Sequence, residues 1–315
     1  MRQWMGIVAN RFEFKCAVCS VCDGRGCIGQ MPGMGGVNNN KNFKLNFEGW
    51  KKLRQKAVSD GTIKSILSIP VETSAVRAGP VTGAVQNIGF EKEDYFYLPY
   101  FSAARCGDIG LCVGDGYPDY KLHYGLDAVR KLQKAEPDLK AAVFLKPYPN
   151  EKLFERIEAA RGAAEIIGND IDSYNIETMR NLVRLEKKTP AQISEIRKKI
   201  SVPYALKGIF CKEDIELVKE VKPDIAFISN HGGRIDTREG STAEFLAEYG
   251  KEIKKYCGEI WVDGGVRTRH DIQTALFYGA SQVIIARPFV AALVSDGIGG
   301  MIKKIDEIIF GEIID

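Results

Sequence analysis

Short apolar runs alternate with longer amphipathic segments from about Lys64 to the end of the chain. The apolar runs have the length of buried parallel strands. The predicted strands are Val76–Val81, Ile109–Val113, Ala141–Leu145, Glu165–Ile167, Pro203–Leu206, Ile225–Ile228, Ile260–Val262 and Val283–Ile285. The segments between them carry apolar residues at spacings of three and four, which is typical of helices. The predicted helices include Leu122–Lys134, Leu153–Arg161, Ala191–Lys199, Lys212–Glu220, Ala243–Tyr256 and Thr268–Tyr278.

Repeated strand-helix units in this number indicate an α/β protein that forms a closed (β/α)8 TIM barrel, which we place at residues 64–315. An open doubly wound sheet is the alternative architecture. Residues 1–63 are interpreted as a short cysteine- and glycine-rich N-terminal extension, in which Trp50 to Ser59 forms a short amphipathic helix.

The composition is that of a globular protein that acts on a small molecule. The chain has 315 residues, 45% of them hydrophobic and 27% charged, and a net charge of +3. Basic and acidic residues are mixed, so we expect neither a nucleic-acid nor a membrane partner. The chain also shows no apolar run of the roughly 20 residues that span a membrane. Its first residues lack the apolar core of a signal peptide, and we therefore predict a cytoplasmic location.

Four of the eight cysteines lie close together near the N-terminus: Cys16, Cys19, Cys22 and Cys27. Thiolates at such spacing, in a glycine-rich segment, can surround zinc or an iron–sulfur cluster. The spacing matches neither a standard pair of zinc knuckles nor the bacterial ferredoxin pattern. A metal site is therefore predicted, and free thiols, a redox-active pair or ligands for a partner remain alternatives.

Polar and reactive residues follow most of the predicted strands, on the face where barrel enzymes carry their active sites. They are Thr82, Gly114, Asp115, Lys146, Asp170, Asp172, Lys207, His231, Arg234, Asp263, Arg267 and Arg287. After the sixth strand, Gly232 and Gly233 permit backbone turns that let His231 and Arg234 converge on one small molecule. Lys207 is open to three interpretations: a Schiff-base nucleophile, a stabiliser of a developing anion, or a solvated strand end.

The loops after the seventh and eighth strands indicate a phosphate site. Asp263-Gly264-Gly265-Val266-Arg267 opens a helix, and Ala286-Arg287-Pro288 follows the last strand. Glycines let backbone N–H groups approach an anion, arginines add charge-assisted hydrogen bonds, and these two loops are a frequent phosphate site of the fold. We therefore expect a phosphorylated cofactor or substrate.

Four motifs together resemble the FMN-dependent α-hydroxy-acid oxidase and dehydrogenase family, which includes glycolate oxidase and lactate oxidase. They are Leu206-Lys207-Gly208-Ile209, Ser229-Asn230-His231-Gly232-Gly233-Arg234, Asp263-Gly264-Gly265-Val266-Arg267 and Ala286-Arg287-Pro288. The resemblance is close over Pro203–Phe289 and weaker back to about Pro80.

The resemblance implies an oxidoreductase that oxidises a 2-hydroxy acid or a related small anionic substrate. His231 would be the base, Arg234 the clamp on the substrate carboxylate, and Asp172 the partner that raises the affinity of His231 for a proton. Lys207 would stabilise the reduced flavin ring. The remaining predicted FMN contacts are Pro80, Val81, Thr82, Gly114, Ser229, His231, Asp263, Gly264, Gly265, Arg267, Ala286 and Arg287.

The chain departs from the family pattern after the third strand. Lys146 stands where the family has a substrate-facing tyrosine, and Tyr148 could replace that tyrosine only if the loop shifts. Asp170 stands where a threonine is common. The extra positive charge of Lys146 would suit a more anionic substrate, or it would be neutralised by Asp170 or Asp172. Lys146 is therefore predicted to bind substrate.

Two other functions remain open at this point. One is an FMN barrel that uses reduced flavin on a diphosphate, as type 2 isopentenyl diphosphate isomerase does. The other is a non-catalytic redox or metal sensor built on the cysteine cluster. If the cysteines hold an iron–sulfur cluster, electrons could pass through it to an acceptor protein. The resemblance also implies a homo-oligomer.

Overall fold

The structure, a computed structural model, describes residues 41–88, 90–176, 179, 182–235 and 238–311. Eight parallel strands form a closed barrel in chain order. They are β1 (Val76–Ala78), β2 (Gly110–Gly114), β3 (Ala141–Leu145), β4 (Ala164–Asp170), β5 (Tyr204–Ile209), β6 (Ile225–Ile228), β7 (Glu259–Asp263) and β8 (Gln282–Ile285). Because β1 pairs with both β2 and β8, the sheet has no edge, and the open-sheet alternative is wrong. The predicted (β/α)8 barrel is confirmed.

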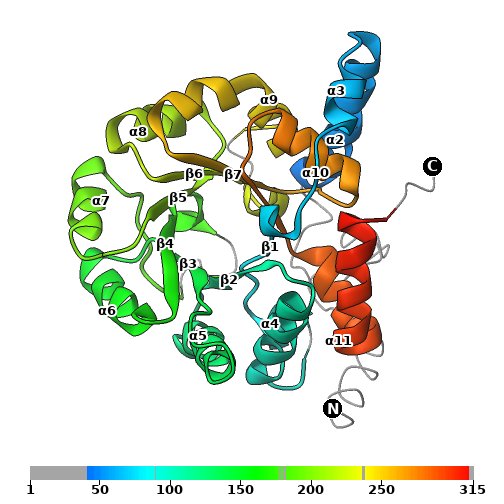
Figure 1. The fold of residues 1–315 in the computed structure, drawn as a ribbon. Helices are drawn as coiled ribbons and strands as arrows, with labels where there is room; N and C mark the ends of the chain where they lie inside the picture. Colours follow the sequence, from blue (N-terminus) through cyan, green and yellow to red (C-terminus); the bar gives the residue numbers. More distant parts are fainter. Residues whose placement is uncertain (1–40, 89, 177–178, 180–181, 236–237, 312–315) are drawn as a thin grey trace.

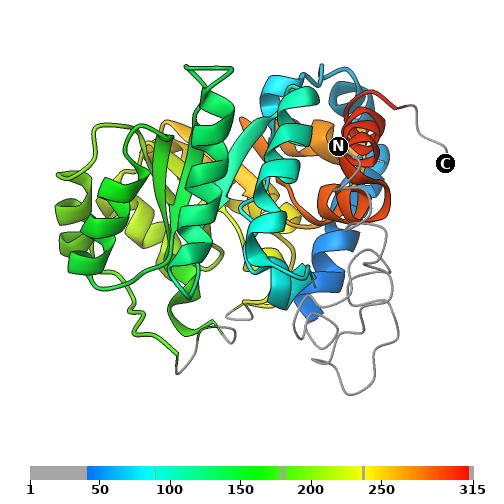
Figure 2. The same cartoon turned by 90° about the horizontal axis from the view of Figure 1, so that it is seen from below.

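Helices surround the barrel and cover the outer faces of its strands (Figure 1). They are α4 (Tyr97–Cys106), α5 (Tyr120–Gln133), α6 (Asn150–Ala160), α7 (Pro190–Arg197), α8 (Lys212–Val221), α9 (Thr242–Ile253), α10 (Arg269–Phe277) and α11 (Arg287–Ile309). Two further helices precede the barrel, α2 (Lys41–Ser59) and α3 (Ile63–Leu67). Figure 2, turned by 90°, shows helices packed along the outside of the strands.

Helix α2 begins nine residues earlier than the pattern predicts, at Lys41 instead of Trp50. Its first turns contain Asn42 and Asn46, which look like solvated residues in the sequence but are 2% and 1% exposed. Both side chains hydrogen-bond to loops of the barrel about 190 positions further along the chain. These long-range contacts stabilise a segment whose local sequence does not predict a helix.

Alternating side chains of the strands fill the barrel interior. The inward residues form a cluster that includes Ala142 and Phe144 of β3, Phe227 of β6 and Trp261 of β7. Phe144, Phe227 and Trp261 pack edge to face, with ring centroids 5.3 to 6.3 Å apart. Since side chains on one face of a strand recur every two residues, the next inward position on each strand lies at the carboxyl end of the barrel.

Continuing that alternation along the chain predicts which side chains reach the carboxyl end. Lys207 follows the inward-facing Ala205 by two residues, and Asp263 follows Trp261 in the same way. The other positions at this spacing are Gly114 after Cys112, Lys146 after Phe144, Ser229 after Phe227 and Ala286 after Ile284. The fold therefore brings residues from six strands to one opening.

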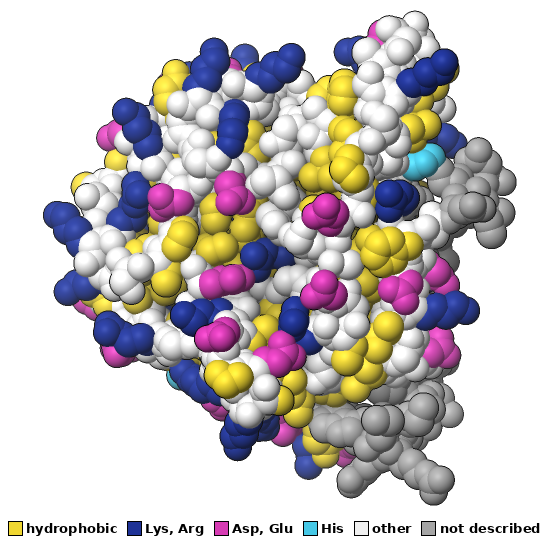
Figure 3. Space-filling model, viewed as in Figure 1, with side chains coloured by type: hydrophobic (Ala, Val, Ile, Leu, Met, Phe, Trp, Pro, Cys, Tyr) yellow, Lys and Arg dark blue, Asp and Glu magenta, His cyan; other side chains and the backbone are white. Residues whose placement is uncertain are grey.

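Several predictions lie outside what the structure tests. Cys16, Cys19, Cys22 and Cys27 are not among the described residues, and the domain boundary after residue 63 stays a prediction. No helix in the described part of the chain is long and apolar enough to cross a membrane. Figure 3 shows basic and acidic side chains interspersed over the face turned to the viewer, as the composition suggests.

Candidate active site

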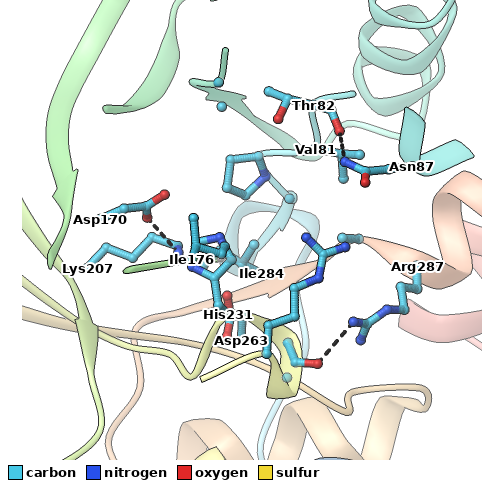
Figure 4. A pocket seen from close by; sticks show the side chains of 18 of the residues that line it. Val81, Thr82, Asn87, Asp170, Ile176, Lys207, His231, Asp263, Ile284 and Arg287 are labelled. Atoms are coloured by element: carbon cyan, nitrogen blue, oxygen red, sulfur yellow. Dashed lines mark hydrogen bonds and ion pairs between the residues drawn. The ribbon is translucent and has the colours of Figure 1, made fainter. Parts of the chain in front are cut away.

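A pocket opens at the carboxyl end of the barrel and encloses about 1160 Å³, its open mouth included. Most of the predicted site residues line it: Pro80, Val81, Thr82, Gly114, Lys146, Lys207, His231, Arg234, Asp263, Gly264, Gly265, Arg267, Ala286 and Arg287. Two predicted residues, Asp172 and Ser229, lie behind this lining and contact His231. Figure 4 shows Asp170 and Lys207 on one side of the pocket and Arg287 on the other.

His231 is held by a strained turn directly after β6. His231, Gly232 and Gly233 have φ angles of 56°, 67° and 92°, a left-handed conformation that glycine adopts readily and histidine does not. The Asn230 side chain accepts a hydrogen bond from the Gly233 N–H at 2.9 Å, and the Ser229 hydroxyl accepts one from the His231 N–H at 3.1 Å. These bonds offset the strain, which lies at the predicted base.

Both ring nitrogens of His231 have partners. Nδ1 lies 3.2 Å from a carboxylate oxygen of Asp172, and Nε2 lies 3.1 Å from Nζ of Lys146. An ammonium group can only donate, so Nε2 accepts this bond and the proton of the neutral ring is on Nδ1, facing Asp172. The lone pair that would take a substrate proton therefore points at Lys146.

The pKa of His231 is lowered to about 4. Burial is the largest cause, and the nearby Lys146 ammonium adds to it. Asp172 raises the pKa, as the sequence predicted, but this contribution is outweighed. His231 is consequently neutral, and able to accept a proton, throughout the pH range of ordinary assays.

Lys146 belongs to a buried row of charges. Its Nζ lies 2.7 Å from Asp170, whose other oxygen lies 2.7 Å from Nζ of Lys207. Burial alone would raise the pKa of Asp170, but Lys146 and Lys207 lower it well below its usual range. Burial alone would lower the pKa of Lys207, but Asp170, Asp172 and Asp263 raise it. Asp170 thus stays an anion between two cations. Lys207 stays a charged ammonium, so this geometry does not favour the interpretation of Lys207 as a Schiff-base nucleophile.

Tyr148 does not enter the pocket. Its side chain is 1% exposed and packs against Arg156, whose guanidinium carbon lies 4.3 Å from the ring centroid. Lys152 lies over the same ring. The loop shift that would let Tyr148 replace the tyrosine of the resembled family is therefore not seen, whereas Lys146 lines the pocket.

The opposite end of the pocket is suited to an anion. Gly264 and Gly265 have φ angles of 94° and 79°, and Arg267 and Arg287 line the same end. A Cβ atom on Gly265 would lie 1.8 Å from the carbonyl oxygen of Asn46, so this position requires glycine. Burial lowers the pKa of Arg267 to about 10, which still leaves the guanidinium charged.

Asp263 connects the two ends. One carboxylate oxygen accepts a hydrogen bond from the Ser229 hydroxyl at 3.0 Å, while Oδ1 is buried without a hydrogen-bond partner among the described residues. Burial raises the pKa of Asp263 to about 6. A buried acceptor without a donor is costly, so this atom fits a hydroxyl-bearing ligand that spans the pocket.

Comparison with known proteins identifies the family of the chain. Residues 126–312 match the model of the FMN-dependent dehydrogenase family. The chain belongs to this family. The 2-hydroxyacid oxidase of Dictyostelium discoideum is 38% identical over 106 residues, 33% of this chain and 27% of that protein. L-lactate dehydrogenase (cytochrome) of Saccharomyces cerevisiae is 31% identical over 257 residues, 80% of this chain and 41% of that protein.

The chain thus spans 27% and 41% of the length of these two relatives. A solved structure of mandelate oxidase with (S)-2-phenylpropionate has a TM-score of 0.58 and 20% identity, covering 75% of this chain and 71% of that one, and shows the shared fold. The predictions of an FMN-dependent dehydrogenase family, of the barrel and of FMN as the cofactor are confirmed. The family match supports the dehydrogenase interpretation over the isomerase.

The residues present fit the cofactor of FMN-dependent dehydrogenases. Its phosphate matches the end with Arg267 and Arg287, and its ribityl hydroxyl groups match the unpaired oxygen of Asp263. Lys207 lies at the other end, beside Asp170. The pocket therefore offers a cation at one end and an anion site at the other, as the elongated cofactor of the family requires.

Several residues that line the pocket were not predicted to bind ligand, and the polar ones among them include Asn87, Asp115, Tyr117, Lys121 and Asp170. Asn87 belongs to the loop after β1 and donates to the Thr82 carbonyl at 2.8 Å. Asp115 accepts a hydrogen bond from the Lys146 backbone N–H at 3.1 Å and pairs with Arg156. Asp115 was expected on this face because it directly follows a strand, although it was not predicted to bind ligand. Asn87 lies further from its strand and Lys121 lies in the first turn of α5, so neither position carried such a signal.

Proposed function

We propose that the protein oxidises a small 2-hydroxy acid to the 2-oxo acid, with FMN as the electron acceptor. The observation that carries the proposal is that the neutral His231, with its lone pair on Nε2, shares one pocket with Arg234 and Lys207. A base, a cation for a carboxylate and a cation for a reduced cofactor are the three groups that this reaction needs.

The chain's residues would act at defined atoms of the substrate. Arg234 would hold the carboxylate through its planar guanidinium, and His231 Nε2 would take the hydroxyl proton. The C–H hydrogen leaves with its electron pair, and the carbon–oxygen bond becomes a carbonyl. A bound FMN supplies the two-electron acceptor for that pair. Asp172, at 3.2 Å from Nδ1, would stabilise the imidazolium that results.

Lys146 would contact the substrate oxygen that loses the proton. The substrate hydroxyl must displace Lys146 from the lone pair of His231, since both groups need Nε2 as an acceptor. Lys146 would then donate to the hydroxyl oxygen and stabilise the charge that develops there. Its charge is already matched by Asp170 at 2.7 Å, which favours a substrate with one carboxylate over a more anionic one.

The remaining interpretations follow from the same site. We infer that Lys207, Asp263, Arg267 and Arg287 hold FMN through its ring, ribityl chain and phosphate, and that Ser229 acts by positioning His231. The terminal electron acceptor, either oxygen or a protein, the metal at the N-terminal cysteines and a homo-oligomeric state are proposals that rest on the sequence alone. The names of the relatives include both oxidases and a cytochrome-linked dehydrogenase.

A spectroscopic experiment tests the proposal. Purified protein loaded with FMN is mixed anaerobically with a panel of 2-hydroxy acids, and the loss of the flavin absorbance is followed. We expect at least one 2-hydroxy acid to bleach the flavin in the wild type. The variant His231→Ala should keep FMN bound but lose this bleaching.

Three outcomes would contradict the proposal. Bleaching by His231→Ala at the wild-type rate would overturn the role of the base. Turnover of a diphosphate only after prior reduction of the flavin would favour the isomerase. A colourless protein that holds stoichiometric metal and refuses added FMN would favour the non-catalytic sensor.

A further inference from the structure

One face of helix α2 contacts the two loops that form the active site. Its buried side chains recur at helical spacing and include Phe43, Asn46 and Trp50. This face packs against the turn at His231–Gly233 and against the loop of Gly264 and Gly265. The helix precedes the barrel in the chain, and the sequence assigns it no role in catalysis.

Asn46 makes a reciprocal amide pair with Asn230, the residue before the predicted base. Asn46 Nδ2 donates to Asn230 Oδ1 at 2.7 Å, and Asn230 Nδ2 donates to Asn46 Oδ1 at 3.0 Å. The same oxygen of Asn230 accepts the Gly233 N–H that closes the His231 turn. Both side chains are fully buried, at 1% and 0% exposure. Asn46 therefore fixes the oxygen on which the strained turn depends.

Asn46 also contacts the anion end of the pocket. A Cβ atom on Gly265 would lie only 1.8 Å from the backbone oxygen of Asn46, so the helix and the loop are in direct contact. Oδ1 of Asn46 accepts the Thr242 N–H at 3.0 Å, and the Thr242 hydroxyl donates to the carbonyl oxygen of Asp263. Trp50 adds a bond from Nε1 to the Gly264 carbonyl at 2.8 Å.

The two arginines of the anion end lie on phenylalanine rings of the same helix. The guanidinium carbon of Arg287 is 4.4 Å from the ring centroid of Phe43, and that of Arg267 is 5.5 Å from that of Phe47. Such cation–π contacts help to fix the direction of a guanidinium group, and Arg287 also donates to the Gly232 carbonyl at 3.0 Å. The helix thus contacts Gly264, Gly265, Arg267 and Arg287 at the anion end of the pocket.

We propose that Asn46 is a positioning residue that joins the loop of the base to the loop of the cofactor phosphate. Through its side-chain amide it holds the His231 turn, and through its backbone and Thr242 it holds Gly264, Gly265 and Asp263. The two loops then keep one relative position, which sets the position of the base over the cofactor. For the catalytic readout, this inference rests on the proposed function.

The test exchanges the amide for a carboxyl group of the same shape. In Asn46→Asp, a protonated carboxyl donates to Asn230 Oδ1 as the amide does, whereas a carboxylate places two acceptor oxygens opposite each other in a buried site. We expect FMN to bind within about threefold of the wild-type affinity at about pH 5 and at least about tenfold more weakly at about pH 8. FMN affinity is measured by fluorescence quenching, and each value is divided by the wild-type value at the same pH.

Two controls separate hydrogen bonding from charge and packing. Asn46→Leu removes the hydrogen bonds permanently and should bind FMN at least about tenfold more weakly at both pH values. Gln55→Asp adds the same charge on the exposed side of α2 and should match the wild type at both. His231, Asp263, Arg267 and Arg287 surround the site in all these proteins, so division by the wild-type value removes their own titration.

Equal FMN affinity of Asn46→Asp and the wild type at both pH values would overturn the proposal, as would an equal weakening at both. If Asn46→Asp does not fold, as judged by circular dichroism, Trp50→Phe provides the second test. It removes one hydrogen bond to Gly264 and should weaken FMN binding about threefold to tenfold; unchanged binding would refute the role of the helix. A wild type that no 2-hydroxy acid reduces would refute the proposed function, while the FMN comparison would still test Asn46.

Discussion

Replacing Lys146 by methionine should make the predicted base easier to protonate. The change removes the ammonium that lies 3.1 Å from Nε2 of His231 and keeps an unbranched side chain that is one atom shorter. Coulomb's law gives the loss of a repulsion of about 5 kcal/mol at an effective dielectric constant of about 20 and of about 1 kcal/mol at that of water. Asp170 is present in both proteins, and the pocket opens to solvent, so the effective repulsion lies toward the lower of these two figures. We therefore expect the pKa of His231 to rise by about 1 to 2 units, or about 1.4 to 3 kcal/mol.

The sign of the pH effect follows from the protonation state of a base. His231 accepts a proton only when neutral, so activity is lost as the pH falls through its pKa, which is about 4 in the wild type. The pH dependence of kcat/KM for a 2-hydroxy acid reports this group before substrate binds. Between about pH 5 and 8, kcat/KM of the wild type should show no decrease toward acid pH. For Lys146→Met, kcat/KM should fall tenfold for each pH unit below about pH 5 to 6.

A matched control removes a lysine that does not face the base. Lys152 pairs with Asp119 at 3.1 Å and lies over Tyr148, outside the pocket. Lys152→Met should therefore keep the acid limb of the wild type. An acid limb that stays in place in Lys146→Met, or that moves to lower pH, would refute the electrostatic role of Lys146.

Three further changes test the site by other measurements. Gly265→Ala should abolish FMN binding or the yield of soluble protein, because its Cβ would lie 1.8 Å from a carbonyl oxygen. Gly61 has the same φ of 79° but lies in open space, so Gly61→Ala should lower the free energy of unfolding in urea by only about 1 to 2 kcal/mol. Asp263→Ala should weaken FMN binding about 10- to 100-fold by fluorescence titration, since a charge-assisted hydrogen bond is lost; an unchanged affinity would contradict its contact with the cofactor. Asp170→Asn should lower the free energy of unfolding by about 3 to 5 kcal/mol, because two buried cations lose their partner. Asp127→Asn, at an exposed ion pair, should lower it by less than about 1 kcal/mol. Equal losses in the two variants would contradict the stabilising role of Asp170 in the buried row of charges.

The barrel and most of its pocket could be predicted because they follow from periodicity. Strand runs and helix spacing give the order of elements, and the alternation of side chains carries the inward series to positions such as Lys207 and Asp263. Such reasoning needs only local sequence. It also places Asp170 and Asp172 at the end of the fourth strand, where both were noted.

The rest depends on contacts between distant parts of the chain. Asn46 and Asn230 are separated by 184 positions, so nothing in the pattern of α2 shows that a buried amide pair fixes its polar residues. The net pKa of His231 was likewise inaccessible, because the contribution of Asp172 could be anticipated but its balance against burial and Lys146 could not. Opposing electrostatic contributions require distances before the larger can be identified.

The polar groups of the site form one continuous chain of contacts in which His231 is neutral and the lysines are paired with carboxylates, and this order explains why Lys146 and Asp170 occur together. Asp172, His231, Lys146, Asp170 and Lys207 each contact the next at 2.7 to 3.2 Å. A lysine beside a histidine base would be unfavourable alone, since it opposes the imidazolium that catalysis produces. The neighbouring carboxylate compensates the lysine, and the second lysine keeps that carboxylate ionised. Lys146 and Asp170, the two predicted departures from the family pattern, are therefore one change in physical terms: a buried ion pair beside His231, which under the proposed function would leave the base neutral and supply a cation at the substrate oxygen.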